Sequence, residues 1–241
     1  MGLLSLAIWL PIVSGVLLLA LGRDEQAGAV RWVALVTSFA SFLATVPLIT
    51  GFDRSTAAMQ FEENFGWIER FNVHYHLGVD GISVWFPMLT AFITFVVVIA
   101  AWEVITDRVS QYMGAFLILS GLMVGVFCAL DGLLFYVFFE ATLIPMYIII
   151  GVWGGPKRVY AAFKFFLYTL AGSVLMLLGI LALYFEHFRQ FGFYTFEIAN
   201  LMIEQIGHHH PGDWPLPQTA IDLAARDPAR AVNIPVVEAG T

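Results

Sequence analysis

Long apolar stretches dominate the pattern of hydrophobic and polar residues along this chain. Runs of about twenty mostly apolar residues recur along it, separated for the most part by short polar connections. That length matches the ~20 residues that an α-helix needs to cross the hydrocarbon core of a bilayer. The pattern therefore predicts an all-α, polytopic transmembrane helix bundle. We expect six spans, at about residues 3–22, 30–51, 81–102, 112–130, 132–152 and 161–184.

A single acidic residue, Asp131, interrupts the nearly forty apolar residues that form the fourth and fifth expected spans. Such a run is too long for one span and has the right length for two helices joined by a tight turn at Asp131-Gly132. We expect Asp131 to cap the N-terminus of the fifth span, because an aspartate there accepts hydrogen bonds from free backbone N–H groups. Proton transfer by Asp131 is the less favoured alternative. Asp80, just before the third span, is interpreted in the same way.

Two segments depart from the spanning pattern. In residues 52–80 a polar stretch leads into Phe71–Leu77, where apolar and polar residues alternate with a period of two, which predicts a short extramembrane β-hairpin. From about residue 205 onward no apolar run is long enough to span, and the segment contains several prolines. We therefore divide the chain into a transmembrane region, 1–205, and a polar tail, 206–241.

Composition supports a lipid rather than an aqueous environment. Of the 241 residues, 60% are hydrophobic and only 12% are charged, about half of the ~25% charged residues usual in soluble domains. The net charge of −7 does not favour nucleic acid as a partner. The one cysteine, Cys128, lies inside an apolar run, so this chain alone forms neither a disulfide nor a CxxC site.

Glu140 is the most informative residue, because it lies eight positions into the fifth expected span, about 12 Å from its start. An ionised carboxylate is costly at that depth. Tyr136 and Tyr147 share its helical face and form a polar stripe. Pro145 cannot donate to the carbonyl of Ala141, which leaves a free acceptor nearby and predicts a kink. The pattern favours a proton-transfer site, with a protonated acid hydrogen-bonded across a helix interface as the alternative.

Lys164 lies about one turn into the sixth expected span, with Tyr168 one turn further on the same face. Two interpretations stay open. Lys164 is a candidate member of a proton path with Glu140, or its long stem carries the ammonium to the headgroups beside Lys157 and Arg158. In an antiparallel hairpin Glu140 and Lys164 lie at different depths, which argues against a direct salt bridge.

Other chemistry finds little support in the sequence. The run His208-His209-His210 has metal-ligating side chains, but a proline-containing tail is poorly preorganised, so we expect a solvated loop and no metal site. The six histidines all lie outside the apolar runs, which argues against haem held between spans. The chain also lacks a glycine-rich phosphate loop, a Ser-His-Asp set and a nicotinamide or flavin fingerprint. We expect no redox chemistry within this chain.

Several stretches carry a family resemblance. The segment from Asp131 to Tyr147, DGLLFYVFFEATLIPMY, resembles the fifth-helix motif of the antiporter-like subunits of respiratory complex I. The stretches LGVDGIS, from Leu77, and AFKFFLYT, from Ala162, match that family as well. Mrp-type cation/proton antiporters share the DxxxFYxxFE pattern. However, LIPMYIIIGVWGG and KFFLYTLAGS match more fully the M-subunit family of bacterial NADH:quinone oxidoreductase, homologous to mitochondrial subunit four.

The resemblance implies a function. It implies a multi-pass subunit of the bacterial inner membrane that contributes a proton-translocation half-channel to a proton-pumping NADH:quinone oxidoreductase, with Glu140 as the key proton-transfer residue. In the family a lysine in the next, broken helix and further helices complete the path. The expected partners are other membrane subunits of complex I. NADH, FMN, iron–sulfur clusters and quinone are expected on partner subunits, and no cofactor is expected in this chain.

Two alternatives remain beside this function. One is an Mrp-type subunit that exchanges a monovalent cation for protons. The other is a truncated, non-transporting scaffold, because the resemblance covers only about residues 1–205 and the family continues through many more spans. The resemblance therefore implies the N-terminal portion of such a subunit.

The distribution of basic residues predicts how the chain is oriented in the membrane. The connections at 23–29, 103–111 and 153–160 share one side of the bilayer and carry Arg23, Arg108, Lys157 and Arg158. By the positive-inside rule that side is cytoplasmic, so the N-terminus, His74 and the tail face the outside. We expect a cysteine introduced at Arg108 to react with an impermeant maleimide only from the cytoplasmic side, and one at His74 only from outside. Labelling of the 52–80 loop from the cytoplasmic side alone would contradict this orientation.

Overall fold

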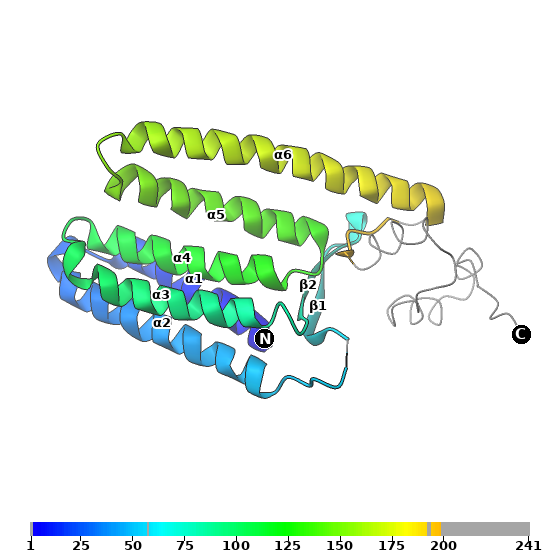
Figure 1. Cartoon of the computed structure of the whole chain (residues 1–241), viewed down its shortest axis with the longest axis horizontal. Coiled ribbons are helices and arrows are strands. Elements are labelled where there is room, and N and C mark those ends of the chain that lie inside the picture. The colour runs from blue at the N-terminus through cyan, green and yellow to red at the C-terminus, as the bar shows by residue number, and fades with distance from the viewer. Residues whose placement is uncertain (1, 57, 192–193, 199–241) are drawn as a thin grey trace, which may run out of the picture.

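The computed structural model describes residues 2–56, 58–191 and 194–198, and these form an antiparallel helical bundle with a small polar layer at one end (Figure 1). Each of the six helices is long and apolar enough to cross a membrane. This confirms the predicted all-α bundle of about six spans. The helices are α1 (Leu3–Leu21), α2 (Ala27–Thr50), α3 (Trp85–Val104), α4 (Val109–Cys128), α5 (Gly132–Trp153) and α6 (Arg158–Phe191), with a short 3-10 turn, η1 (Asp24–Gln26), before α2.

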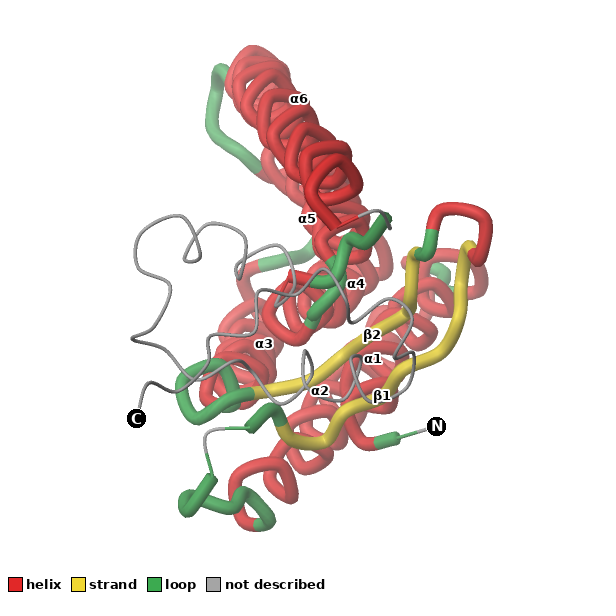
Figure 2. The backbone as a smooth tube through the Cα atoms, turned by 90° about the vertical axis from the view of Figure 1, so that its right-hand side faces the viewer, coloured by secondary structure: helices red, strands yellow, loops and turns green. Residues whose placement is uncertain are grey.

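A two-stranded antiparallel hairpin lies across the ends of the helices (Figure 2). Its strands are β1 (Gln60–Ile68) and β2 (Val73–Val79), joined through the 3-10 turn η2 (Glu69–Phe71). Asn72 closes the return with a φ of 53°, a left-handed conformation that asparagine tolerates better than most residues. The hairpin predicted within residues 52–80 is therefore confirmed.

The connection between α4 and α5 extends this polar layer. The N–H of Leu130 donates to the carbonyl of His76 in β2 at 2.9 Å, and the N–H of Ile198 donates to the carbonyl of Leu130 at 2.9 Å. The N–H of Gly132 donates to the carbonyl of Phe196 at 2.7 Å. The α4–α5 connection is thus held on one side by β2 and on the other by the short segment around Phe196–Ile198.

Asp131 caps α5, as predicted. Its Oδ1 accepts hydrogen bonds from the N–H groups of Leu133 and Leu134, at 2.9 and 3.0 Å, while its Oδ2 accepts from the N–H of His74 at 3.1 Å. Burial raises the pKa of Asp131, and these hydrogen bonds act in the opposite direction. The same carboxyl therefore binds the start of β2 and the start of α5.

Asp80 plays a slightly different part from the one predicted. Its Oδ1 accepts from the N–H groups of Ile82 and Ser83, at 3.1 and 2.6 Å, and so caps a turn that precedes α3. The helix consequently begins at Trp85, not at about residue 81. Burial acts to raise the pKa of Asp80, but the hydrogen bonds from Ser83 and Ile82 outweigh burial and lower it.

Helices α1 and α4 approach so closely that their backbones touch. A Cβ atom built on Gly15 would lie 2.6 Å from the carbonyl oxygen of Gly114, and one built on Gly114 would lie 2.8 Å from that of Gly15. Two turns further along α4, a Cβ atom built on Gly121 would meet the carbonyl oxygen of Ile8 and the side chain of Ile12. Small residues allow this approach, which gives helices in lipid their van der Waals contact.

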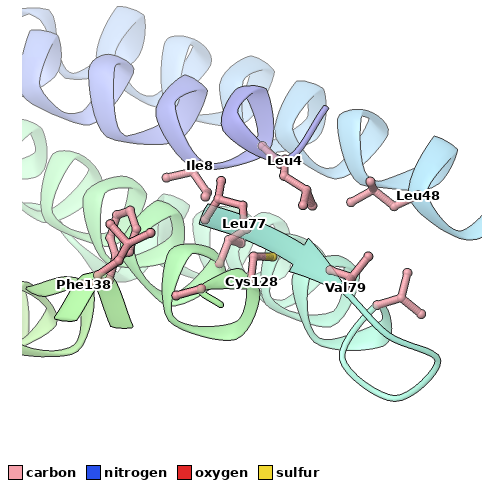
Figure 3. Close-up of a cluster of buried hydrophobic side chains, with 12 residues drawn as sticks. Leu4, Ile8, Leu48, Leu77, Val79, Cys128 and Phe138 are labelled. Carbon is pink, nitrogen blue, oxygen red and sulfur yellow. The ribbon is translucent and has the colours of Figure 1, made fainter. Parts of the chain in front are cut away.

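The apolar core continues from the bundle into the hairpin. Leu77 and Val79 of β2 are fully buried, and Figure 3 shows them among side chains from α1, α2, α4 and α5. These side chains include Leu4, Ile8, Leu48, Cys128 and Phe138. The hairpin is therefore part of the core that holds the helix ends in place.

The side chain of Glu63, in β1 of the hairpin, caps the N-terminus of α1, although the two are far apart in the sequence. Glu63 accepts hydrogen bonds from the N–H groups of Gly2, Leu4 and Ser5, at 3.1, 2.9 and 3.1 Å, and from the Ser5 hydroxyl at 2.6 Å. The first N–H groups of a helix have no intrahelical partner and carry partial positive charge, so a buried carboxylate satisfies them and contributes about 1–2 kcal/mol.

Helix α6 occupies the edge of the bundle, beside α5 (Figure 1). It is the least buried of the six helices and runs to Phe191, beyond the end expected near residue 184. Large apolar side chains such as Leu175 and Leu178 are exposed along it. The tail expected at 206–241 lies outside the described residues.

The two sets of connections that were predicted to lie on opposite sides of the membrane lie at opposite ends of the bundle. The hairpin, the start of α1 and the start of α5 share one end, and the α1–α2, α3–α4 and α5–α6 connections share the other (Figure 1). Trp32 and Trp102 meet edge to face at the basic end, with ring centroids 5.4 Å apart. Which end is cytoplasmic stays a prediction.

A buried histidine joins three parts of the polar layer. The Nδ1 of His76 in β2 lies 3.3 Å from an oxygen of Glu197, and its Nε2 lies 3.7 Å from an oxygen of Glu62 in β1. Burial disfavours the protonated imidazole, but the hydrogen bond and charge of Glu197, followed by the charge of Glu62, outweigh burial and raise the pKa of His76 above 6.5.

This raised pKa predicts a pH-dependent stability. Stabilisation by protonated His76 is fully present below about pH 6.5 and is lost as pH rises through the raised value. We expect the unfolding temperature in detergent to fall from pH 6 to pH 9, and to fall less in His76→Gln. His74→Gln, in the same strand, is the matched control and should retain the wild-type slope. Equal slopes in wild type and His76→Gln would contradict the assignment.

Candidate proton-transfer site

Glu140 projects from α5 eight residues after Gly132, which places it about 12 Å along the helix from its capped end. The side chain is partly buried, and its Oε2 is fully shielded with no hydrogen-bond partner among the described residues. Buried carboxyl oxygens are rarely left unsatisfied, because the loss of water is costly. Arg31 Nε and Ser41 Oγ of α2 are also buried without a partner, but Glu140 Oε2 is the carboxyl oxygen among these atoms.

The residues predicted to accompany Glu140 divide between two faces of α5. Tyr147 points toward α6, where its ring meets that of Phe166 edge to face with centroids 5.7 Å apart. Tyr136, one turn before Glu140, is partly buried. Pro145 is buried, and α5 continues through it to Trp153. By helical spacing Pro145 lies one heptad beyond Phe138, which packs on α4, so it does not share the stripe of Glu140.

The contacts between α5 and α6 define their register. A Cβ atom on Gly151 would lie 3.6 Å from the Cβ of Ala162, and Tyr147 meets Phe166. Near the other end, Leu133 and Ile180 pack into one cluster, and a Cβ atom on Gly132 would lie 3.6 Å from Ile180. Each step forward along α5 is therefore matched by an equal step backward along α6.

This register places Ser173 level with Glu140. Glu140 is one heptad from Leu133 and one from Tyr147, and Ser173 is one heptad from Ile180 and one from Phe166. Residues seven apart lie on the same face of a helix. Glu140 and Ser173 thus lie level with each other in the α5–α6 interface, here called the seam, midway between these two contacts. The side chain of Ser173 is 3% exposed.

Lys164 does not share this position. It lies nine residues before Ser173 on α6, so it is about 13 Å from the level of Glu140 along the helix axis. Its side chain is exposed, and its Nζ lies 6.0 Å from the ring centroid of Tyr160, toward the start of α6. Tyr168 is 74% exposed. The geometry agrees with the headgroup interpretation, and a role for Lys164 in a proton path stays a prediction.

Other candidate sites lie elsewhere or outside the described residues. A cavity of about 220 Å³ lies near the end of α2 and the start of α3, and Glu140 does not line it. Within residues 2–56, 58–191 and 194–198, no group of three His, Cys, Asp or Glu side chains is placed to hold a metal ion. His208, His209 and His210 fall outside these ranges.

Ser173 and Glu63 carry no local sequence signal of their roles. Ser173 lies in an apolar span, and only the heptad spacing of both helices, combined with their register, connects it with Glu140. Glu63 lies 58 residues from Ser5, whose N–H it binds, and no local pattern announces such a distant cap.

The chain is similar to known proteins over the same helices. The family model described as "NADH:quinone oxidoreductase/Mrp antiporter, TM" matches residues 129–207. The chain is 51% identical over 185 residues to NADH-quinone oxidoreductase subunit M of Rhodobacter capsulatus and 38% identical over 208 residues to that of Rickettsia prowazekii. It is 44% identical over 184 residues to NADH-ubiquinone oxidoreductase chain 4 of Arabidopsis thaliana. The chain is homologous to these subunits.

The matches cover most of this chain and a smaller part of each relative. They span 76%, 86% and 76% of the chain, but only 36%, 41% and 37% of the three relatives. The chain thus spans about two-fifths of the length of the curated relatives it matches, in agreement with the N-terminal portion that the sequence motifs implied.

Solved structures show the same antiporter-like fold. A chain of respiratory complex I from Thermus thermophilus with bound NADH superposes with a TM-score of 0.67 at 31% identity, covering 83% of this chain and 38% of that one. The Mrp complex from Dietzia sp. superposes with a TM-score of 0.61 at 19% identity, covering 92% of this chain and 22% of that one. The second likeness shows the fold alone.

The position of Lys164 leads to a graded prediction for its variants. Because its ammonium lies near the basic end and about 13 Å from the level of Glu140, we expect Lys164→Ala in the full-length subunit to lower NADH-driven proton uptake by no more than about threefold. Lys164→Arg should retain most of the uptake, since it keeps the charge and reach. Proton uptake by inside-out membrane vesicles provides the measurement, and unchanged uptake in Lys164→Ala would assign the lysine to the headgroups alone.

Proposed function

We propose that this chain belongs to a membrane subunit of a proton-pumping NADH:quinone oxidoreductase, in which Glu140 transfers protons within a half-channel. The observation that carries the proposal is the unbonded, buried Oε2 of Glu140, about 12 Å into a helix that the family model matches. An acid with a fixed cation beside it would be held as a carboxylate. Among the described residues no Lys, Arg or His side chain forms an ion pair with Glu140.

Electron transfer is proposed to occur on partner subunits. The sequence lacks nicotinamide and flavin fingerprints, and the spans offer no paired histidines for haem. NADH, FMN, iron–sulfur clusters and quinone would then bind elsewhere in the complex. This chain would contribute a proton path driven by conformational or electrostatic changes that reach it from those partners.

The exposed surface of α6 supports membrane partners. Only α5 packs substantially on α6 within the described chain, and apolar side chains remain exposed along its length. Because the relatives are about two and a half times longer than the matched region, further helices of a full-length subunit, or neighbouring subunits, would cover this face. We place the protein in a bacterial inner membrane with its N-terminus outside, on the distribution of basic residues.

A second candidate is an Mrp-type cation/proton antiporter subunit, because the matching family model includes both groups in its description. The higher identity to M subunits, 38–51% in two bacterial relatives against 19% for the Mrp structure, favours the oxidoreductase. Proton uptake that depends on NADH and not on a sodium gradient distinguishes the two.

Glu140 provides the decisive test of the proposed function. Glu140→Gln keeps the size of the side chain but cannot release a proton in the working pH range, so NADH-driven proton uptake should fall at least ~10-fold, since proton-transfer groups typically contribute ~10²–10⁴-fold. Glu140→Asp keeps the acid and should retain part of the uptake. Uptake is measured in inside-out vesicles, with blue-native gels to confirm assembly.

Glu103→Gln, at the exposed end of α3, is the matched control and should behave as wild type. If Glu140 is only a packing acid, glutamine should be the milder of the two substitutions at that position. Normal uptake in an assembled Glu140→Gln complex would refute the proton-transfer role.

A further inference from the structure

We propose that Ser173 is the positioning residue of Glu140, a hydroxyl that accepts from the protonated acid and donates to the carboxylate. This inference rests on the proposed function and extends it across the seam to α6. It starts from two facts: a shielded carboxyl oxygen on α5 lacks a partner, and a buried hydroxyl on α6 lies at the same level.

The geometry leaves little freedom in this pairing. Tyr147 and Phe166 meet one heptad to one side, and one heptad to the other side Leu133 and Ile180 pack against the same cluster, with Ile180 also next to Gly132. Between these contacts the helices cannot change register without losing one of them. The side chains that lie level with each other midway between these contacts are therefore Glu140 and Ser173.

Ser173 has the hydrogen-bonding capacity that this role needs. Its Oγ donates to the carbonyl of Leu170 at 3.0 Å. A hydroxyl has one donor and two acceptor positions, so the bond to Leu170 leaves acceptor positions on the Ser173 Oγ for the O–H of a protonated Glu140. When Glu140 loses its proton, rotation of the hydroxyl about the Cβ–Oγ bond redirects the Ser173 O–H to the carboxylate.

The rotation has a low cost because the Leu170 carbonyl does not depend on Ser173. Within the continuous helix α6, that carbonyl also accepts the N–H of Val174. The serine therefore exchanges a supplementary hydrogen bond for a charge-assisted one, which is about twice as strong. The seam provides a partner for each protonation state of Glu140.

Few charged or titratable side chains near this pair are placed to bind the Glu140 carboxyl in place of Ser173. Residues 169–177 of α6 include no Asp, Glu, His, Lys or Arg. On α5 the tyrosines of the stripe, Tyr136 and Tyr147, flank Glu140 one turn before it and two turns after it. On α4 the titratable side chains are Tyr112 and Cys128, near its two ends. Lys164 lies about 13 Å along the axis. The other hydroxyl in this stretch of α6, that of Thr169, lies one turn before Ser173 and donates to the carbonyl of Phe165 at 2.9 Å.

The test uses dicyclohexylcarbodiimide, which reacts with protonated carboxyl groups in membranes, and measures modification of Glu140 against pH by peptide mass spectrometry. In the full-length subunit in native membranes, Ser173→Ala removes the donor to the carboxylate. Half-maximal modification should then shift upward by about one pH unit. Ser173→Thr retains the hydroxyl and should restore the wild-type profile.

Ser38→Ala is the matched control. Ser38 of α2 is 1% exposed, and its hydroxyl donates to the carbonyl of Leu35 at 3.0 Å, as Ser173 does to Leu170. This control should leave the profile unchanged, and NADH-driven proton uptake should fall about three- to tenfold only in Ser173→Ala.

The outcomes separate the two proposals. If Glu140→Gln abolishes uptake but Ser173→Ala matches Ser38→Ala in both measurements, the role of Ser173 is wrong and that of Glu140 stands. If Glu140→Gln pumps normally, the proposed function is wrong, and the modification profile still decides whether Ser173 bonds Glu140. A Ser173→Thr variant that behaves like Ser173→Ala would also overturn the hydroxyl's role.

Discussion

The close approach of α1 and α4 is the contact on which the rest of the bundle depends. In lipid the helices gain little from burying apolar surface against each other, because the surrounding acyl chains are equally apolar. Contact between backbones at Gly15 and Gly114 supplies attraction that bulky side chains would prevent. With α4 fixed in this way, α5 packs on it through Phe138 and Gly125, and α6 then packs on α5.

The polar layer at one end of the bundle determines the heights of the helices. Glu63 holds the start of α1, and Asp131 holds the start of α5 while it also binds β2. These buried carboxylates satisfy N–H groups that have no partner in their own helix. The hairpin therefore fixes the starting positions of α1 and α5 relative to each other.

Much of this architecture could be predicted from the sequence, because its signals are local. Apolar runs of about twenty residues indicated the six helices, alternation indicated the hairpin, and Asp131 before an apolar run indicated a cap. The depth of Glu140 followed from counting along one helix. The cap from Glu63 and the pairing with Ser173 could not be predicted, because both depend on how distant segments meet. Lys164 required the register of α5 and α6 before its distance from Glu140 was known.

Hydrogen bonds hold the connection between α4 and α5 in place. The number of residues between Asp131 and Glu140 is therefore a stricter requirement than the identity of those residues. The connection around Asp131 is bound by β2 on one side and by the segment around Phe196 on the other. The geometry of α5 then fixes the position of each residue that follows. One inserted residue between Asp131 and Glu140 would turn the carboxyl by about 100° and shift it by about 1.5 Å. It would then leave the seam with α6. Substitutions in this stretch alter packing, whereas an insertion or deletion would remove the acid from its place.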